Sequence, residues 1–181
     1  CGGNIAWHTE NDTLEIADRD NLLRDMRIYL LSVLRVTQAE VLPFDFTATA
    51  GNFAATLARD AVAAGELADL SPAITASEEC RAAVATLQRD AATGALPATR
   101  ANAALKRLAR ILVPLDFTKG PRFTHDPAFT APALPCLAVA NELKRHAGTM
   151  RGFAQTQLLR GRNRYVAALR EATRIVRAAG G

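Results

Sequence analysis

The sequence is poor in the residues on which several protein classes depend. Only 6% of its 181 residues are aromatic, and its three cysteines, Cys1, Cys80 and Cys136, are odd in number and far apart. That pattern excludes a disulfide scaffold and a CxxC metal motif, so Cys80 and Cys136 are expected to be small core residues. No uncharged apolar run approaches the roughly 20 residues that a membrane-spanning helix needs, so no membrane span is expected.

Alanine is the residue that the sequence has in excess. It occurs 37 times, and 49% of the chain is hydrophobic, which excludes an intrinsically disordered protein. Because Ala loses no side-chain entropy on entering a helix, this composition favours helix over sheet. We therefore predict an all-α fold, a helical bundle of the four-helix type.

Apolar periodicity and helix-breaking residues divide the chain into predicted helices. The first begins near Asp18 or Asp20 and ends near Gln38, and its apolar residues lie on two sides, which predicts cover by more than one neighbour. The further ranges are 47–66, 71–94, 97–114, a short helix at 137–146, and 150–178. The side chains expected to face inward are Phe53, Leu57, Val62, Cys80, Val84, Leu87, Leu105, Leu108, Leu112, Leu159, Val166, Leu169, Thr173 and Val176.

Three local signals predict where these helices begin and end. Ser71 precedes Pro72, which predicts Ser71 as the cap with proline in the first turn. Thr75 has a glutamate three residues later, the spacing of a capping box, which predicts a second start. Pro97 is expected to open the helix that Pro114 closes.

The segment 114–137 differs from the rest of the chain. It holds five of the eight prolines and has almost no periodicity. Connectors of this length are uncommon inside compact domains and are often functional, and prolines make them stiff. We predict a long Pro-rich loop that wraps over a surface of the bundle.

Positive charge is concentrated near the end of the sequence. Residues 144–181 carry nine Lys or Arg against the single Glu171, within a chain of net charge +4. Such a segment can bind nucleic acid or an anionic membrane, dock on an acidic neighbour, or remain a solvated stripe. No aromatic interleaving or nucleic-acid motif accompanies it, so a free-standing basic helical protein that binds nucleic acid or membrane is the alternative function.

Few residues of the sequence suggest chemistry by themselves. The three histidines, His8, His125 and His146, are far apart, and HExxH, GxSxG, P-loop and GxGxxG motifs are absent. His8 has acidic neighbours, but zinc needs at least three protein ligands, which makes an independent zinc protein a minor alternative. His125 precedes an Asp-Pro pair, which favours a turn over an oriented base, and His146 is expected to interact with a helix dipole. These residues identify no catalytic group.

Six short segments, taken in their order along the chain, form a recognisable set. They are WHTENDT at 7–13, VLPFDF at 41–46, PLDF at 114–117, GPRFTHDP at 120–127, LP at 134–135 and LRGRNR at 159–164. Together these segments resemble zinc peptidases of the glutamate carboxypeptidase and transferrin receptor family, which includes N-acetylated-alpha-linked acidic dipeptidase. The resemblance covers the last part of the catalytic domain and the helical dimerisation domain.

The resemblance implies a division of roles within a larger zinc peptidase. Residues 1–43 would be the remnant of the catalytic domain, and residues 44–181 the transferrin-receptor-like dimerisation domain. His8 falls on the family's last zinc-ligand position, while the other ligands and the catalytic Glu lie upstream in the family. The resemblance therefore implies a chain that is not catalytic alone and holds no zinc alone. The parent would be a zinc-dependent carboxypeptidase.

The same resemblance implies partners and a substrate-proximal loop. The expected partners are a second copy of the chain and the parent's catalytic domain, with peptide substrate bound only by the full-length parent. A Lys-Tyr pair that grips the terminal glutamate in the mammalian enzyme corresponds to Ala128 and Phe129, and Trp7 replaces a Tyr, which argues against glutamate specificity. We expect dimerisation, with the helices at 47–66 and 150–178 as contacts.

Overall fold

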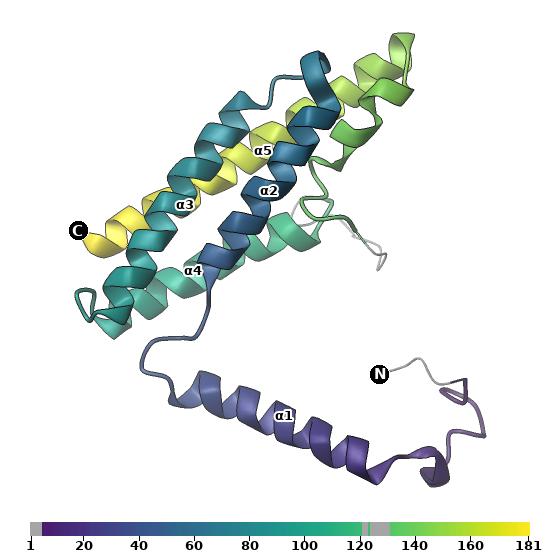
Figure 1. The fold of residues 1–181 in the computed structure, drawn as a ribbon, viewed down its shortest axis with the longest axis vertical. Coiled ribbons are helices and arrows are strands. Elements are labelled where there is room, and N and C mark those ends of the chain that lie inside the picture. The colour runs from purple at the N-terminus through teal and green to yellow at the C-terminus, as the bar shows by residue number, and fades with distance from the viewer. Residues whose placement is uncertain (1–4, 121–122, 124–130) are drawn as a thin grey trace. The chain divides into compact units, whose positions relative to one another are not determined.

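The computed structural model describes residues 5–120, 123 and 131–181. The chain divides into two compact units, residues 1–43 and residues 44–181. Within the described ranges every assigned element is a helix, which confirms the predicted all-α class (Figure 1).

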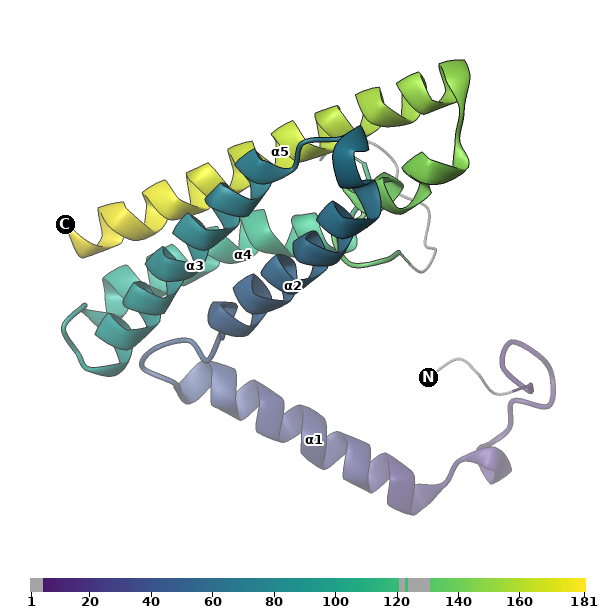
Figure 2. The ribbon, with the colours of Figure 1, turned by 45° about the horizontal axis from the view of Figure 1, so that its top comes forward.

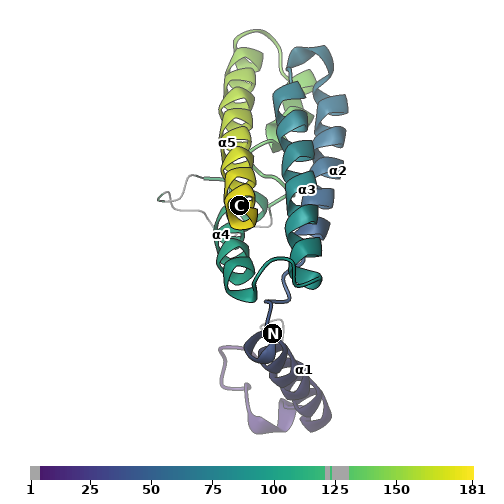
Figure 3. The ribbon, with the colours of Figure 1, turned by 90° about the vertical axis from the view of Figure 1, so that its left-hand side faces the viewer.

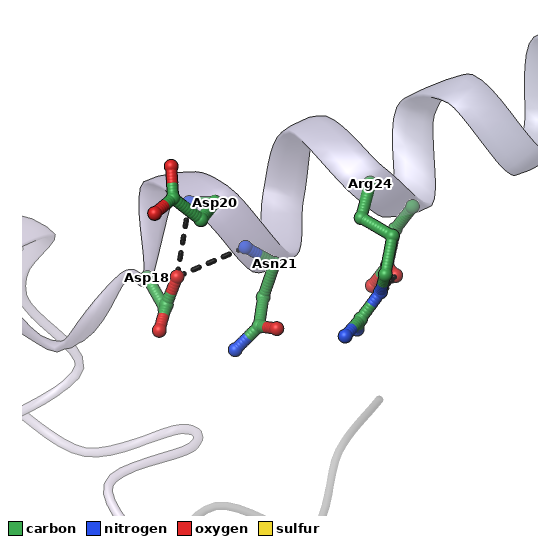
Figure 4. A network of polar contacts seen from close by, with 5 residues as sticks. Asp18, Asp20, Asn21 and Arg24 are labelled. Atoms are coloured by element: carbon green, nitrogen blue, oxygen red, sulfur yellow. Dashed lines mark hydrogen bonds and ion pairs between the residues drawn. The ribbon is translucent and has the colours of Figure 1, made fainter.

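The first unit contains one long helix, α1 (Arg19–Gln38), preceded by the short 3₁₀ helix η1 (Leu14–Ile16). Asp18 caps α1: its Oδ1 accepts hydrogen bonds from the backbone N–H groups of Asp20 and Asn21, both at 2.9 Å (Figure 4). Two of the four N–H groups that a helix start leaves unpaired are thereby satisfied. The predicted start of the first helix near Asp18 is confirmed.

The second unit is a bundle of helices. Helix α3 packs on both α2 and α5, α4 packs on α5, and η3 packs against α2 and α5 (Figures 1, 2 and 3). The elements are α2 (Phe46–Ala64), η2 (Gly65–Leu67), α3 (Ser71–Ala92), α4 (Ala98–Phe117), η3 (Ala138–Arg145) and α5 (Gly148–Gly180).

Helix α5 spans 33 residues, and its two halves have different neighbours. Helix α4 runs antiparallel along the C-terminal half: Arg100, near the start of α4, donates to the carbonyl of Ala178, while Arg164 donates to Thr118 just after its end. The N-terminal half packs against η3 instead. Helix α5 therefore holds two parts of the bundle together, with α4 on its C-terminal half and η3 on its N-terminal half.

The core lies where the helices of the bundle face one another. Tyr165 is fully buried, its hydroxyl lies 2.7 Å from the Oγ of Ser77, and its ring packs 6.2 Å from that of Phe53. Twelve side chains predicted to face inward are buried: Phe53, Leu57, Cys80, Val84, Leu87, Leu105, Leu108, Leu112, Val166, Leu169, Thr173 and Val176.

Two residues predicted to face inward do not. Val62 is 79% exposed, because it follows Leu57 by five residues, about 140° round the helix from the buried face. Leu159 is 46% exposed, while its neighbour Leu158 is buried. Leu158 takes the buried place in this turn of α5, so the predicted heptad fails at Leu159, while its other positions, from Val166 to Val176, are buried.

The predicted starts around Ser71 are partly wrong. Leu70 occupies the cap position of α3 and Ser71 lies inside the helix, where its N–H donates to the Asp69 carboxylate at 2.9 Å. Pro72 does lie in the first turn, as predicted. Helix α3 continues unbroken through Thr75, so no second start exists there.

Pro114 does not close α4, which continues to Phe117. Proline removes one backbone donor, but Leu115 in the following turn is buried and holds that turn against the core. The carbonyl of Pro114 accepts hydrogen bonds from both the N–H and the Oγ1 of Thr118, at 3.1 and 2.7 Å. Packing and capping together outweigh the lost hydrogen bond.

Much of the predicted Pro-rich loop lies outside the described residues, so the loop stays a prediction. After it, Leu134 and Leu137 are buried in the bundle, and the predicted short helix at 137–146 is the 3₁₀ helix η3. Cys1 and His125 also lie outside the described residues.

Candidate functional site

Trp7 and His8 lie in a turn before η1. Their rings are tilted by 40° to each other with centroids 4.0 Å apart, and the backbone of His8 has a φ of 63°, a left-handed conformation in which His is enriched. The turn is closed by Thr9, whose Oγ1 and N–H donate to the carbonyl of Ala6 at 2.6 and 3.0 Å. The His8 side chain is thereby presented on the exposed side of a fixed turn.

A zinc site cannot be built from the described residues alone. Among them, no group of three or more His, Cys, Asp and Glu side chains is close enough to hold a metal ion. Because zinc takes at least three protein ligands, His8 can be at most one ligand of a site that other residues complete. Ala128 and Phe129, which the resemblance places near a substrate, lie outside the described residues.

The helix α1 carries a continuous apolar surface. None of its residues is buried, and the exposed fractions of its large apolar side chains run from 39% at Leu34 to 74% at Tyr29. The two-sided cover predicted from the sequence is therefore not provided within residues 1–43. The α1 apolar surface consists of Leu22, Leu23, Met26, Ile28, Tyr29, Leu30, Leu31, Val33, Leu34 and Val36.

The bundle has smaller exposed apolar positions on its predicted contact helices. Val62 near the end of α2 and Phe153 near the start of α5 are both exposed. They belong to the same end of the bundle, because Gln155 donates to the carbonyl of Leu67 at 2.8 Å and Lys144 reaches the carbonyl of Val62 at 3.5 Å. This end is a second candidate surface for contact between copies.

The arginines of α5 partly hold the bundle together. Arg162 donates to the backbone carbonyl of Asp69 at 2.8 Å, and Arg164 donates to the carbonyl of Lys119 at 3.0 Å. Arg151 donates to a carbonyl in the segment before α5 at 2.8 Å. These side chains link α5 to neighbouring elements, so the positive charge is not one free stripe. Nucleic-acid binding stays a prediction.

A buried carboxylate that the sequence analysis missed lies between α2 and η3. Asp60 is only 4% exposed, and its Oδ1 accepts a 2.7 Å hydrogen bond from the side-chain amide of Asn141. Its Oδ2 has no hydrogen-bond partner among the described residues. Burial raises the pKa of Asp60, opposed by Asn141 and by the charge of Arg59. Its position three residues after the buried Leu57 is the signal that could have revealed it.

Substitution of Asp60 by Asn is expected to stabilise the bundle at neutral pH. Because the pKa of Asp60 is higher in the folded chain, the free energy of unfolding falls as pH rises through that folded pKa. Asn cannot ionise and keeps an oxygen for Asn141, so Asp60→Asn removes this fall. Urea unfolding at pH 7 and pH 3 measures the difference in the free energy of unfolding between the variant and the unmodified chain. We expect the variant to be more stable at pH 7 and about equally stable at pH 3.

The Glu79→Gln variant makes the same change of net charge at an exposed residue of α3. We expect its pH dependence to follow that of the unmodified chain. An Asp60→Asn variant that is no more stable than the unmodified chain at pH 7 would contradict the role given to the buried charge.

Comparison with known proteins adds no assignment. No protein-family model, curated protein or solved structure matches the chain. Among the described residues, no helix is both long enough and apolar enough to cross a membrane. The argument for function therefore rests on the exposed surfaces and on the sequence motifs.

Proposed function

We propose that this chain is the dimerisation and structural module of a di-zinc metallopeptidase of the glutamate carboxypeptidase type and is not catalytic by itself. The sequence support is the order of the motifs from WHTENDT at 7–13 to LRGRNR at 159–164. The structural observation that carries the proposal is the α1 apolar surface, which residues 1–43 leave uncovered.

A lone helix with apolar residues on several sides requires a partner. Exposed apolar patches of more than a few hundred Å² are uncommon on monomeric proteins and mark interaction sites. In the parent, the proposed partner of α1 is the catalytic domain, to which residues 1–43 would belong. In the chain alone, the same surface pairs with a second copy.

His8 has a limited part in this proposal. It would supply one ligand to zinc in the parent, with the remaining ligands outside this sequence. Zinc bound in the parent would activate water for peptide hydrolysis. The exposed turn that holds Trp7 and His8 is compatible with a ligand that joins a site built by other residues.

Sedimentation equilibrium over a range of concentrations tests the proposal. A dimer that persists at low micromolar concentration is the expected result. A monomer at every concentration would contradict self-association of this chain.

Paired substitutions identify the surface that makes the contact. Met26 and Leu30 are one turn apart on α1 and are both exposed. The double variant Met26→Gln/Leu30→Gln removes about 3 kcal/mol of apolar burial if both side chains are covered in the dimer. That loss corresponds to a dissociation constant raised about 100-fold. The matched control is Val113→Gln/Phe117→Gln, an exposed apolar pair with the same spacing on α4, which is expected to leave the dimer intact.

A third variant separates the two candidate contact surfaces. Val62→Gln/Phe153→Gln changes the exposed end of the bundle formed by α2 and α5. If this variant alone becomes monomeric, the contact lies on the predicted helices and not on α1. If the α4 control also becomes monomeric, the association is non-specific and the dimerisation proposal fails.

A further inference from the structure

The bundle contains a cavity of about 520 Å³ between the end of α4, the residues around η3 and the middle of α5. Cavities of 300–1,000 Å³ are typical of sites for small molecules. Among the described residues that line this cavity, three side chains are basic, Lys119, Arg160 and Arg164, and one is acidic, Glu142. Its wall therefore carries an excess of positive charge.

The guanidinium of Arg164 is held in position before any ligand arrives. Its Nη1 donates to the carbonyl of Lys119 at 3.0 Å, and its Nη2 donates to the Oγ1 of Thr118 at 3.2 Å. These two acceptors belong to the segment that follows α4, so the arginine is fixed across the gap between two helices. A fixed guanidinium loses little side-chain entropy when it binds a carboxylate or phosphate.

Arg160 lies one helical turn before Arg164, so both line the same wall of the cavity. Two like charges at this spacing repel each other unless an anion lies between them. Arg160 is exposed and lines the cavity, and no hydrogen bond or ion pair with another described residue holds its guanidinium. The pair forms an anion-binding arrangement in which one member is fixed and the other is free to close.

The other described residues of the wall are apolar or neutral. Pro135 and Val139 supply apolar surface, and the half-buried Cys136 lies beside them. Burial raises the pKa of the Cys136 thiol, although Arg164 nearby opposes this, so the sulfur adds no negative charge at neutral pH. A ligand with an acidic head and an apolar body fits this combination.

We propose that this cavity binds a small organic acid, with its carboxylate or phosphate group between Arg160 and Arg164 and its apolar part against Pro135 and Val139. This site is independent of the proposed dimerisation, because none of these residues belongs to α1 and none is among the exposed apolar pairs altered to test the dimer.

The test is a titration of the full chain followed by amide chemical shifts in NMR spectra at constant ionic strength. The probes are butyrate, inorganic phosphate and the neutral isostere butyramide. We expect butyrate and phosphate to shift the amide signals of Val139 and Gly161 in a saturable way, and butyramide to leave them unchanged. Saturation by butyrate at lower concentration than by phosphate identifies a carboxylate with an apolar body, and the reverse identifies a phosphate group.

Arg160→Gln provides the decisive variant, because Arg160 is exposed and makes no hydrogen bond or ion pair with another described residue. We expect it to weaken butyrate and phosphate binding about tenfold, the loss typical of one charge-assisted hydrogen bond. The matched control is Arg170→Gln, another exposed arginine of α5 that does not line the cavity, and it should bind as the unmodified chain does. Equal weakening in both variants, or no saturable shift with either anion, would overturn the proposal.

Discussion

Replacement of Gly161 by Ala is expected to destabilise the bundle by about 3 kcal/mol, because overpacking against rigid neighbours costs that much or more. A Cβ at this position would lie 1.9 Å from the carbonyl oxygen of Cys136 and 2.9 Å from its carbonyl carbon. Both atoms belong to backbone, which cannot rotate away as a flexible side chain can. Either α5 or the segment before η3 must move apart, and the buried Leu134 and Leu137 beside that segment would lose packing.

Gly152→Ala is the matched control on the same helix. A Cβ at Gly152 would meet nothing within 4 Å, so this variant should gain up to about 1 kcal/mol from helix propensity. Urea unfolding followed by circular dichroism compares the two variants. If Gly161→Ala were as stable as Gly152→Ala, the close approach of the Cys136 carbonyl to α5 would be wrong.

The second large effect is expected from a neighbouring pair of leucines on α5. Leu158 is 1% exposed and Leu159 is 46% exposed. Leu158→Ala is expected to cost about 2–5 kcal/mol, because it removes buried methyl groups and leaves a cavity. Leu159→Ala removes the same atoms from a partly exposed site and is expected to cost less than about 1 kcal/mol.

The comparison is internally controlled, since both variants make the same chemical change one residue apart. Midpoints of urea unfolding, with the denaturant slope checked for constancy, give the two values. A larger loss for Leu159→Ala would show that Leu159 faces the core, as predicted from sequence, and that the burial of Leu158 described in the structure is wrong.

Local signals in the sequence predicted helix positions well where one strong interaction decides the outcome. Asp18 caps α1 as expected, since its carboxylate needs only the two N–H groups that follow it. Local signals failed where packing from distant residues competes with them. Pro114 normally ends a helix, but the burial of Leu115 continues α4 past it. The free energy that Pro114 costs the helix is smaller than the free energy gained by burying the apolar side chain of Leu115.

The heptad predicted on α5 failed only at its first position, Leu159, for a related reason. A heptad repeat counted from Val166 places Leu159 on the same side as the core, but a straight helix drifts by about 20° over seven residues. The close contact of Gly161 with Cys136 adds a constraint from another segment and fixes which face of α5 is buried. Periodicity within one helix contains no information about that contact.

The candidate sites differ in how far the sequence could reveal them. The α1 apolar surface is visible as two apolar sides of one predicted helix, because it needs only local periodicity. The cavity is not visible, since Lys119, Glu142 and the arginines of α5 come from three separate segments. Asp60 lies between these two cases. Its position on the apolar face of α2 can be recognised from local periodicity, but its hydrogen bond with Asn141 joins residues 81 positions apart, which periodicity does not reveal.

Because α5 packs on both α3 and α4, it determines the order in which the helices of the bundle can assemble. Helices α3 and α4 contact each other little, and both depend on α5 for most of their cover. During synthesis, α2 and α3 can pair as soon as they leave the ribosome, but α4 lacks its main packing partner until α5 follows. Closure of the core must therefore wait for α5, and until then α4 exposes Leu105, Leu108 and Leu112 to chaperones.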